Sequence, residues 1–175
     1  MSQLLFPNAE INQIKYFTAQ VIARPHDPSQ PTRQRFYFRA LETIPNLEII
    51  KGQFLVSRPR MPLCDNPSER VCVIKTEEKG SDVNLAAHLL NDGYKKSFDS
   101  AVLITNDSDF VDAISLVQKE LGLKVGIANS KRRPAVELRR QASFVKRIRP
   151  GLLGASQFPR EMTDQHGKFR KPSTW

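Results

Sequence analysis

The chain has 175 residues, a formal net charge of +9 at pH 7 and 39% hydrophobic residues, which is the composition of one globular domain with a buried core. Its apolar runs are far shorter than the roughly 20 residues that a membrane-spanning helix needs, which argues against an integral membrane protein. The opening residues 1–7 have neither the basic segment nor the apolar run of a secretory signal, so we expect a cytoplasmic location.

The first half of the sequence predicts a strand, a helix and two more strands, at residues 11–22, 31–44, 47–57 and 71–74. The three strand segments are rich in β-branched and aromatic residues. Pro31 suits a first helical position, apolar residues then recur three or four positions apart, and Pro45 ends the pattern. Several prolines between the last two strands predict an exposed loop.

The second half alternates between helix and strand. The pattern predicts helices at 81–91, 108–121 and from about Pro134, and strands at 101–105, 124–128 and 144–148. This order implies right-handed crossovers and a mostly parallel sheet with helices on both faces, a three-layer Rossmann-like α/β fold. We expect one domain over residues 1–150, followed by a polar, basic tail at 151–175.

Positive charge is concentrated late in the chain. Such an excess attracts polyanions without regard to sequence and in a salt-dependent way, so we expect contacts with a nucleic-acid phosphate backbone from Arg132, Arg133, Arg139, Arg140 and Lys146. A solvated basic face is the alternative explanation. The two cysteines, Cys64 and Cys72, lack both paired spacing and a histidine cluster, so we expect two reduced, structural thiols and no zinc site.

Aspartates follow two neighbouring strands. Asp82 lies in the first turn of the helix at 81–91, and Asp107 and Asp109 come directly after the strand at 101–105. Because ligands of open α/β sheets bind beyond the carboxyl ends of the strands, we expect these side chains to converge there. Hard divalent cations, Mg²⁺ or Mn²⁺, favour such oxygen ligands. Helix capping, which contributes about 1 kcal/mol, explains each aspartate singly, and spacing alone leaves the two interpretations about equal.

Other residues give weaker signals. Glu77 and Glu78 precede the first acidic turn and can support it, although exposed loop carboxylates are the commoner case. His88 lies within a predicted helix and is interpreted as structural, and the histidines have no nucleophile beside them, so a hydrolytic triad is unsupported. The sequence contains neither a dinucleotide-binding fingerprint nor a Walker lysine loop, so a nucleotide cofactor is unsupported too.

Several segments resemble, in the same order, the NYN branch of the PIN-like nucleases, which includes the LabA-like proteins. They are residues 15–19, 75–83 and 105–110, and the closing residues 158–172 with Trp175 resemble the end of that family. The resemblance implies a PIN-like fold and a metal-dependent ribonuclease that cleaves RNA phosphodiester bonds with Mg²⁺ or Mn²⁺. It also implies that Asp82, Asp107 and Asp109 are the catalytic metal ligands, which favours metal binding over capping.

The sequence departs from the family at its beginning. The family opens with an apolar strand that is central to its sheet and ends in an Asp-Gly-x-Asn-like turn, and neither is found here. A truncated reading frame is one explanation; we then expect weak or no cleavage by this chain and cleavage by a version extended upstream. The alternative is a catalytically inactive module that binds RNA or another protein, or a homo-oligomer or second chain that completes the sheet.

Overall fold

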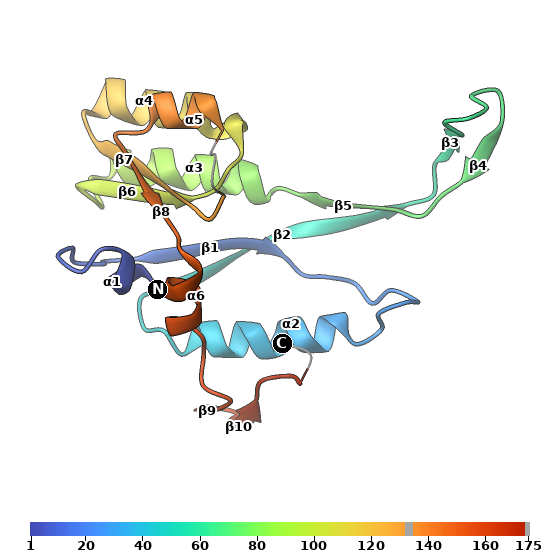
Figure 1. The fold of residues 1–175 in the computed structure, drawn as a ribbon, viewed down its shortest axis with the longest axis horizontal. Helices are drawn as coiled ribbons and strands as arrows, with labels where there is room; N and C mark the ends of the chain where they lie inside the picture. The colour runs from blue at the N-terminus through green and yellow to red at the C-terminus, as the bar shows by residue number, and fades with distance from the viewer. Residues whose placement is uncertain (132–134, 174–175) are drawn as a thin grey trace.

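A computed structural model describes residues 1–131 and 135–173 as an α/β protein with several sheets (Figure 1). In one three-stranded sheet, β1 (Ile14–Ala19) runs parallel to β2 (Leu47–Ser57), which pairs antiparallel with β5 (Lys75–Lys79). We refer to it as the β1–β2–β5 sheet. The predicted strand at 47–57 is confirmed, and the strand expected at 11–22 is shorter at both ends.

The second three-stranded sheet is parallel throughout and has the order β6–β7–β8. It consists of β6 (Ser100–Ile104), β7 (Lys124–Asn129) and β8 (Phe144–Arg147). The segments between these strands form the 3₁₀ turn η1 (Ser108–Phe110), α4 (Val111–Leu121) and α5 (Val136–Gln141). With α3 (Ser81–Tyr94) they enclose the main core, whose most buried side chains are Ile114, Val117, Val125, Ile127 and Leu138.

Helix α3 packs against both sheets. Towards the first sheet, Lys15 of β1 donates to Asp92 Oδ2 at 2.5 Å and lies 3.1 Å from His88 Nδ1, while Phe17 meets the His88 ring edge-on. Towards the second sheet, Leu89 is buried in the main core. His88 therefore has the structural role predicted for it, and α3 is a shared helix between two sheets.

The other faces of the sheets carry different helices. α2 (Gln30–Glu42) covers the β1–β2–β5 sheet, where Tyr37 packs edge-on against Tyr16 of β1. α1 (Ser2–Leu5) and α6 (Pro150–Ala155) cover the β6–β7–β8 sheet, where Leu5 is buried with Ala128 of β7. Each sheet thus has helices on both faces, as the alternating sequence pattern predicts.

The single, mostly parallel sheet expected from the sequence is found only in part. β1 pairs with β2 alone and β6 with β7 alone, and no described strand pairs with both β1 and β6. Each of these strands therefore has one open edge, and both lie in sheets that pack on α3. The expected sheet is divided into two because no described strand supplies backbone hydrogen bonds to the open edges of both β1 and β6.

A long ribbon extends away from the rest of the molecule (Figure 1). It is formed by the ends of β2 and β5 and by a hairpin of β3 (Arg60–Pro62) and β4 (Arg70–Cys72), in place of the expected loop and the strand at 71–74. Cys64 and Cys72 are exposed on it as free thiols. Since both thiols are exposed, neither contributes to a core.

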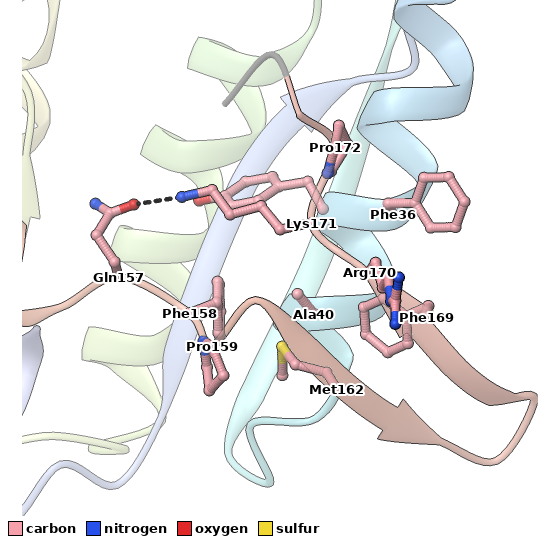
Figure 2. Close-up of a pocket in the computed structure, with 11 residues that line it drawn as sticks. Phe36, Ala40, Gln157, Phe158, Pro159, Met162, Phe169, Arg170, Lys171 and Pro172 are labelled. Atoms are coloured by element: carbon pink, nitrogen blue, oxygen red, sulfur yellow. Dashed lines mark hydrogen bonds between the residues drawn. The ribbon is translucent and has the colours of Figure 1, made fainter.

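The end of the chain is folded against α2, whereas a polar tail was expected. β9 (Glu161–Asp164) and β10 (Gly167–Arg170) form a hairpin in which Phe169 is 7% exposed and stacks on Phe36, with ring centroids 6.5 Å apart. Arg39 donates two hydrogen bonds of 2.6 Å to Asp164. Figure 2 shows the small pocket of about 60 Å³ enclosed there. Trp175 lies outside the described residues.

No helix within residues 1–131 and 135–173 has the length and apolar character needed to cross a bilayer.

Candidate metal site

The first acidic position lies where β5 turns into α3. Gly80 adopts a φ of 91°, a left-handed conformation that glycine accepts without strain, and so permits the sharp turn. Ser81 donates its hydroxyl to the Glu78 carboxylate. Asp82 follows in the first helical turn, and its carboxylate has no hydrogen-bond partner among the described residues. A capping hydrogen bond therefore does not explain Asp82, although its charge still complements the dipole at the start of α3.

The second acidic position follows β6. Thr105 Oγ1 accepts from the Asp107 amide at 3.0 Å, and Asp107 Oδ1 accepts from the Asp109 amide at 3.0 Å. Phe110, 3% exposed, is buried in the main core and fixes the end of this turn. Capping thus occupies one oxygen of Asp107. The remaining oxygen, Oδ2, and the Asp109 carboxylate have no hydrogen-bond partner in the described part of the chain.

The two acidic positions are electrostatic neighbours. Partial burial raises the pKa of Asp82, and the charges of Asp107, Glu78 and Asp109 raise it further. A raised pKa is the expected response of a carboxylate to nearby like charges. The charges of Asp107 and Asp109 therefore act on Asp82, and Glu78, which the sequence indicated only as a supporting residue, acts on it too.

The carboxylate oxygens of these side chains are the type of ligand that a hard divalent cation favours, but in this structure the side chains do not converge on one point. Within residues 1–131 and 135–173, no three carboxylate, histidine or cysteine side chains are close enough together to form a metal site. The available groups are oxygen donors of like charge on neighbouring turns, which is the donor set that Mg²⁺ and Mn²⁺ favour. A cation between them would also relieve the repulsion that raises the pKa of Asp82.

A buried amide supports the turn after β6. Asn129, at the end of β7, is 5% exposed; its Nδ2 donates to the Thr105 carbonyl at 3.1 Å and to Asn106 Oδ1 at 2.5 Å. Its Oδ1 accepts from the Lys131 amide at 2.7 Å. Sequence reasoning missed Asn129. The sequence signal that could have indicated it is a polar residue at the end of an apolar strand, the strand that comes next in the chain after the one that Asp107 and Asp109 follow.

The residues predicted to contact RNA fall into separate groups. Arg132 and Arg133 lie outside the described residues. Arg139 and Arg140 are exposed in the last turn of α5, on the face of the β6–β7–β8 sheet that carries α4. The ammonium of Lys146 lies 5.9 Å from the Phe6 ring on the α1 face. The sheet therefore separates Lys146 from the α5 arginines, and their contact with RNA stays a prediction.

With its acidic edge and its α/β fold, the chain is of the PIN-like class. The NYN domain profile matches residues 10–148, so the chain belongs to the NYN domain family, as the sequence resemblance implied.

The chain is also similar to a curated protein and to a protein of known structure. A Pseudomonas putida protein named 6-hydroxy-3-succinoylpyridine 3-monooxygenase HspA is 31% identical over 184 residues, which include 95% of this chain. The chain spans 58% of that relative's length. The crystal structure of a Vibrio parahaemolyticus protein of unknown function is 17% identical with a TM-score of 0.53, covering 79% of this chain and 70% of that one. At this identity the likeness concerns the fold alone.

Proposed function

We propose that this NYN domain is a metal-dependent ribonuclease acting at Asp82, Asp107 and Asp109. The observation that carries the proposal is the position of these carboxylates on the turns after β5 and β6, where the charges of Asp107 and Asp109 add to the burial that raises the pKa of Asp82. Like charges held together without a compensating partner destabilise a fold, so their retention on two neighbouring turns favours a role with a cation. The two carboxylates that cap nothing, Asp82 and Asp109, are the strongest ligand candidates, and Asp107 contributes Oδ2.

The proposed reaction is hydrolysis of an RNA phosphodiester bond. A bound Mg²⁺ or Mn²⁺ would activate a water molecule and stabilise the leaving oxygen. The chain's own part is positional, because Asp107 caps η1 with one oxygen and thereby fixes the orientation of the other. Arg139 and Arg140 would attract the RNA backbone without reading its bases, since phosphate contacts carry no sequence information. The proposed setting is the cytoplasm.

We also propose that the active form has one more strand, parallel to β1 and β6 and hydrogen-bonded to both. Each of these strands has one open edge, and the two edges belong to sheets that share α3. Open edges of parallel strands leave backbone donors and acceptors for another extended segment. Such a strand would join the two sheets into one mostly parallel sheet. It would come from residues outside this sequence or from a second chain, including a second copy.

Cleavage of a fluorophore-labelled single-stranded RNA tests the proposal. We would compare this chain with a version that carries an additional N-terminal strand, each with Mg²⁺, Mn²⁺ or a chelator. The extended version should cleave in the presence of metal, whereas this chain should be weak or inactive, because small errors in positioning cost large factors in rate.

Asp107→Asn in the extended version provides the mutational test. An asparagine Oδ1 can still accept from the Asp109 amide, so folding should survive while the ligand charge is lost. Asp65→Asn, on the exposed ribbon, is the matched control and should leave cleavage unchanged. Cleavage that persists in Asp107→Asn, or a folded extended protein that cleaves no RNA tested, would replace the nuclease by an RNA-binding or protein-interaction module.

The name of the Pseudomonas relative indicates a second candidate. That protein is named as a monooxygenase of 6-hydroxy-3-succinoylpyridine and shares 31% identity across 95% of this chain. We place this activity second because the chain spans 58% of the relative's length. Turnover of 6-hydroxy-3-succinoylpyridine by the purified protein, supplied with O₂ and a two-electron donor such as a reduced nicotinamide and followed by chromatography, would favour the monooxygenase; no turnover alongside metal-dependent RNA cleavage would favour the ribonuclease.

A further inference from the structure

Asn129 is the buried polar residue of the described core, at 5% exposure, and its side-chain hydrogen bonds go to the turns after β6 and β7. Buried amides are retained where their hydrogen-bonding capacity is used, since an unsatisfied polar group in a core costs roughly 1–3 kcal/mol. Here both ends of the side chain are used. Its amide nitrogen faces the turn after β6 and its oxygen faces the turn after β7.

The bonds form a continuous path to the aspartates. Asn129 holds the Thr105 carbonyl and the Asn106 side chain. The hydroxyl of the same Thr105 accepts from the Asp107 amide, and Asp107 in turn caps the Asp109 amide. Each step is a hydrogen bond of 2.5–3.1 Å, so displacement of the amide at the start displaces the carboxylates at the end.

A second branch leads to the segment before α5. Asn106 Oδ1, which accepts from Asn129, also accepts from the Ala135 amide at 3.1 Å. Asn129 Oδ1 accepts from the Lys131 amide at 2.7 Å. The two asparagines therefore anchor both ends of residues 131–135, which lead into the helix that carries Arg139 and Arg140. One buried amide thus ties the acidic turn to the start of a basic helix.

We propose that Asn129 is a positioning residue of the acidic site, which, through Asn106 and Thr105, fixes Asp107 and Asp109 for cation binding. The inference rests on the proposed metal-dependent function for its purpose, whereas its geometry rests on the hydrogen bonds above. It assigns Asn129 no contact with RNA or cation. The hydrogen bonds of Asn129 restrict the turn after β6 and so reduce the number of conformations in which Asp107 and Asp109 are wrongly placed to bind a cation.

Two substitutions separate this role from simple packing. Asn129→Asp keeps the shape but replaces two donated hydrogen bonds by repulsion between its carboxylate and the oxygens of Thr105 and Asn106. Asn106→Ala leaves the bond from Asn129 to the Thr105 carbonyl intact and removes the bond from Asn129 to Asn106 together with the relay to Ala135. Because Asn106 is in a half-buried turn, this second variant keeps the test informative if Asn129→Asp does not fold. Asn91→Ala, on the exposed side of α3, is the matched control.

The first measurement needs no metal. Amide hydrogen exchange should show faster exchange at Asp107 and Asp109 in Asn129→Asp, by about 10-fold or more, while the core strand residue Val125 is unchanged relative to the Asn91→Ala control. Asn106→Ala should accelerate exchange at Ala135. Unchanged exchange at these amides, or equal acceleration at Val125, would overturn the positioning role.

The second measurement is Mn²⁺ affinity, by electron paramagnetic resonance titration of the full chain. Loss of an outer residue that orients ligands typically costs about 10- to 100-fold in metal affinity, and we expect a loss in this range for Asn129→Asp. Equal Mn²⁺ affinity in the control and in Asn129→Asp would overturn the inference. Absence of Mn²⁺ binding by the unmodified chain, with the exchange result as expected, would instead refute the metal function and leave Asn129 as an anchor of the turn.

Discussion

A single added methyl group at Gly126 is expected to disturb the β6–β7–β8 sheet strongly. Gly126 lies in the central strand, and a Cβ there would meet the Phe144 ring at 2.1 Å. Since ordinary contact begins at 3.4 Å, the ring would have to move by about 1.3 Å. Phe144 packs edge-on against Phe6 with ring centroids 6.1 Å apart, so this movement also loosens the contact with α1.

The expected loss follows from those contacts. Overpacking costs about 1–3 kcal/mol, and an aromatic pair contributes about 0.5–1.5 kcal/mol. We therefore expect Gly126→Ala to lower the free energy of unfolding by about 2 kcal/mol, measured by urea denaturation followed by circular dichroism. In a Phe144→Ala background the ring is absent, and the same change should be neutral or stabilise by up to about 1 kcal/mol. A penalty that persists in this background would refute the role assigned to Phe144.

Three further predictions concern charge. Because partial burial, and after it the neighbouring carboxylates, raise the pKa of Asp82, its contribution to stability is present below the unfolded value of 3.8 and is lost as pH rises through the raised value. Asp82→Asn should thus stabilise the metal-free protein by about 0.5 kcal/mol at neutral pH in thermal melts, yet weaken Mn²⁺ binding. The Arg39 ion pair lowers the pKa of Asp164 to about 2, so its stabilisation is present above pH 3.8 and is lost as pH falls towards 2; Arg39→Met should remove that part of the acid unfolding profile. Reversing the charges of Arg139 and Arg140 to Glu should weaken binding of unrelated single-stranded RNAs and reduce its salt dependence in fluorescence anisotropy titrations.

Elements with strong hydrophobic periodicity could be predicted from the sequence. The strand at 47–57 and the helix at 108–121 match the structure closely, the latter as η1 followed by α4. The C-terminal hairpin could not be predicted, because its stability depends on contacts with α2 that lie far away in sequence. Phe169 stacks on Phe36, and no local pattern near residue 169 reports that partner.

The candidate site was predictable only in part from chain position. The turns after β5 and β6 carry the predicted aspartates, and the charges of Asp107 and Asp109 act on Asp82, but β5 and β6 belong to different sheets, so the expected shared sheet edge is not formed. The support from Asn129 was not predictable, since it depends on which turn a buried side chain reaches in three dimensions. The division into two sheets was not predicted, because strand patterns contain no information on which edges are paired.

The position of α3 between the two sheets affects the order in which the parts of the protein unfold. The main core belongs to the β6–β7–β8 sheet, where several large side chains are fully buried, while the strands of the β1–β2–β5 sheet are mostly half-buried. With no strand pairing across the division, cooperativity between the halves passes largely through α3 and contacts such as that of Lys15 with Asp92. The half containing β1 and α2 should therefore open at lower denaturant concentration, as a separate folding unit, than the half that carries Asp107.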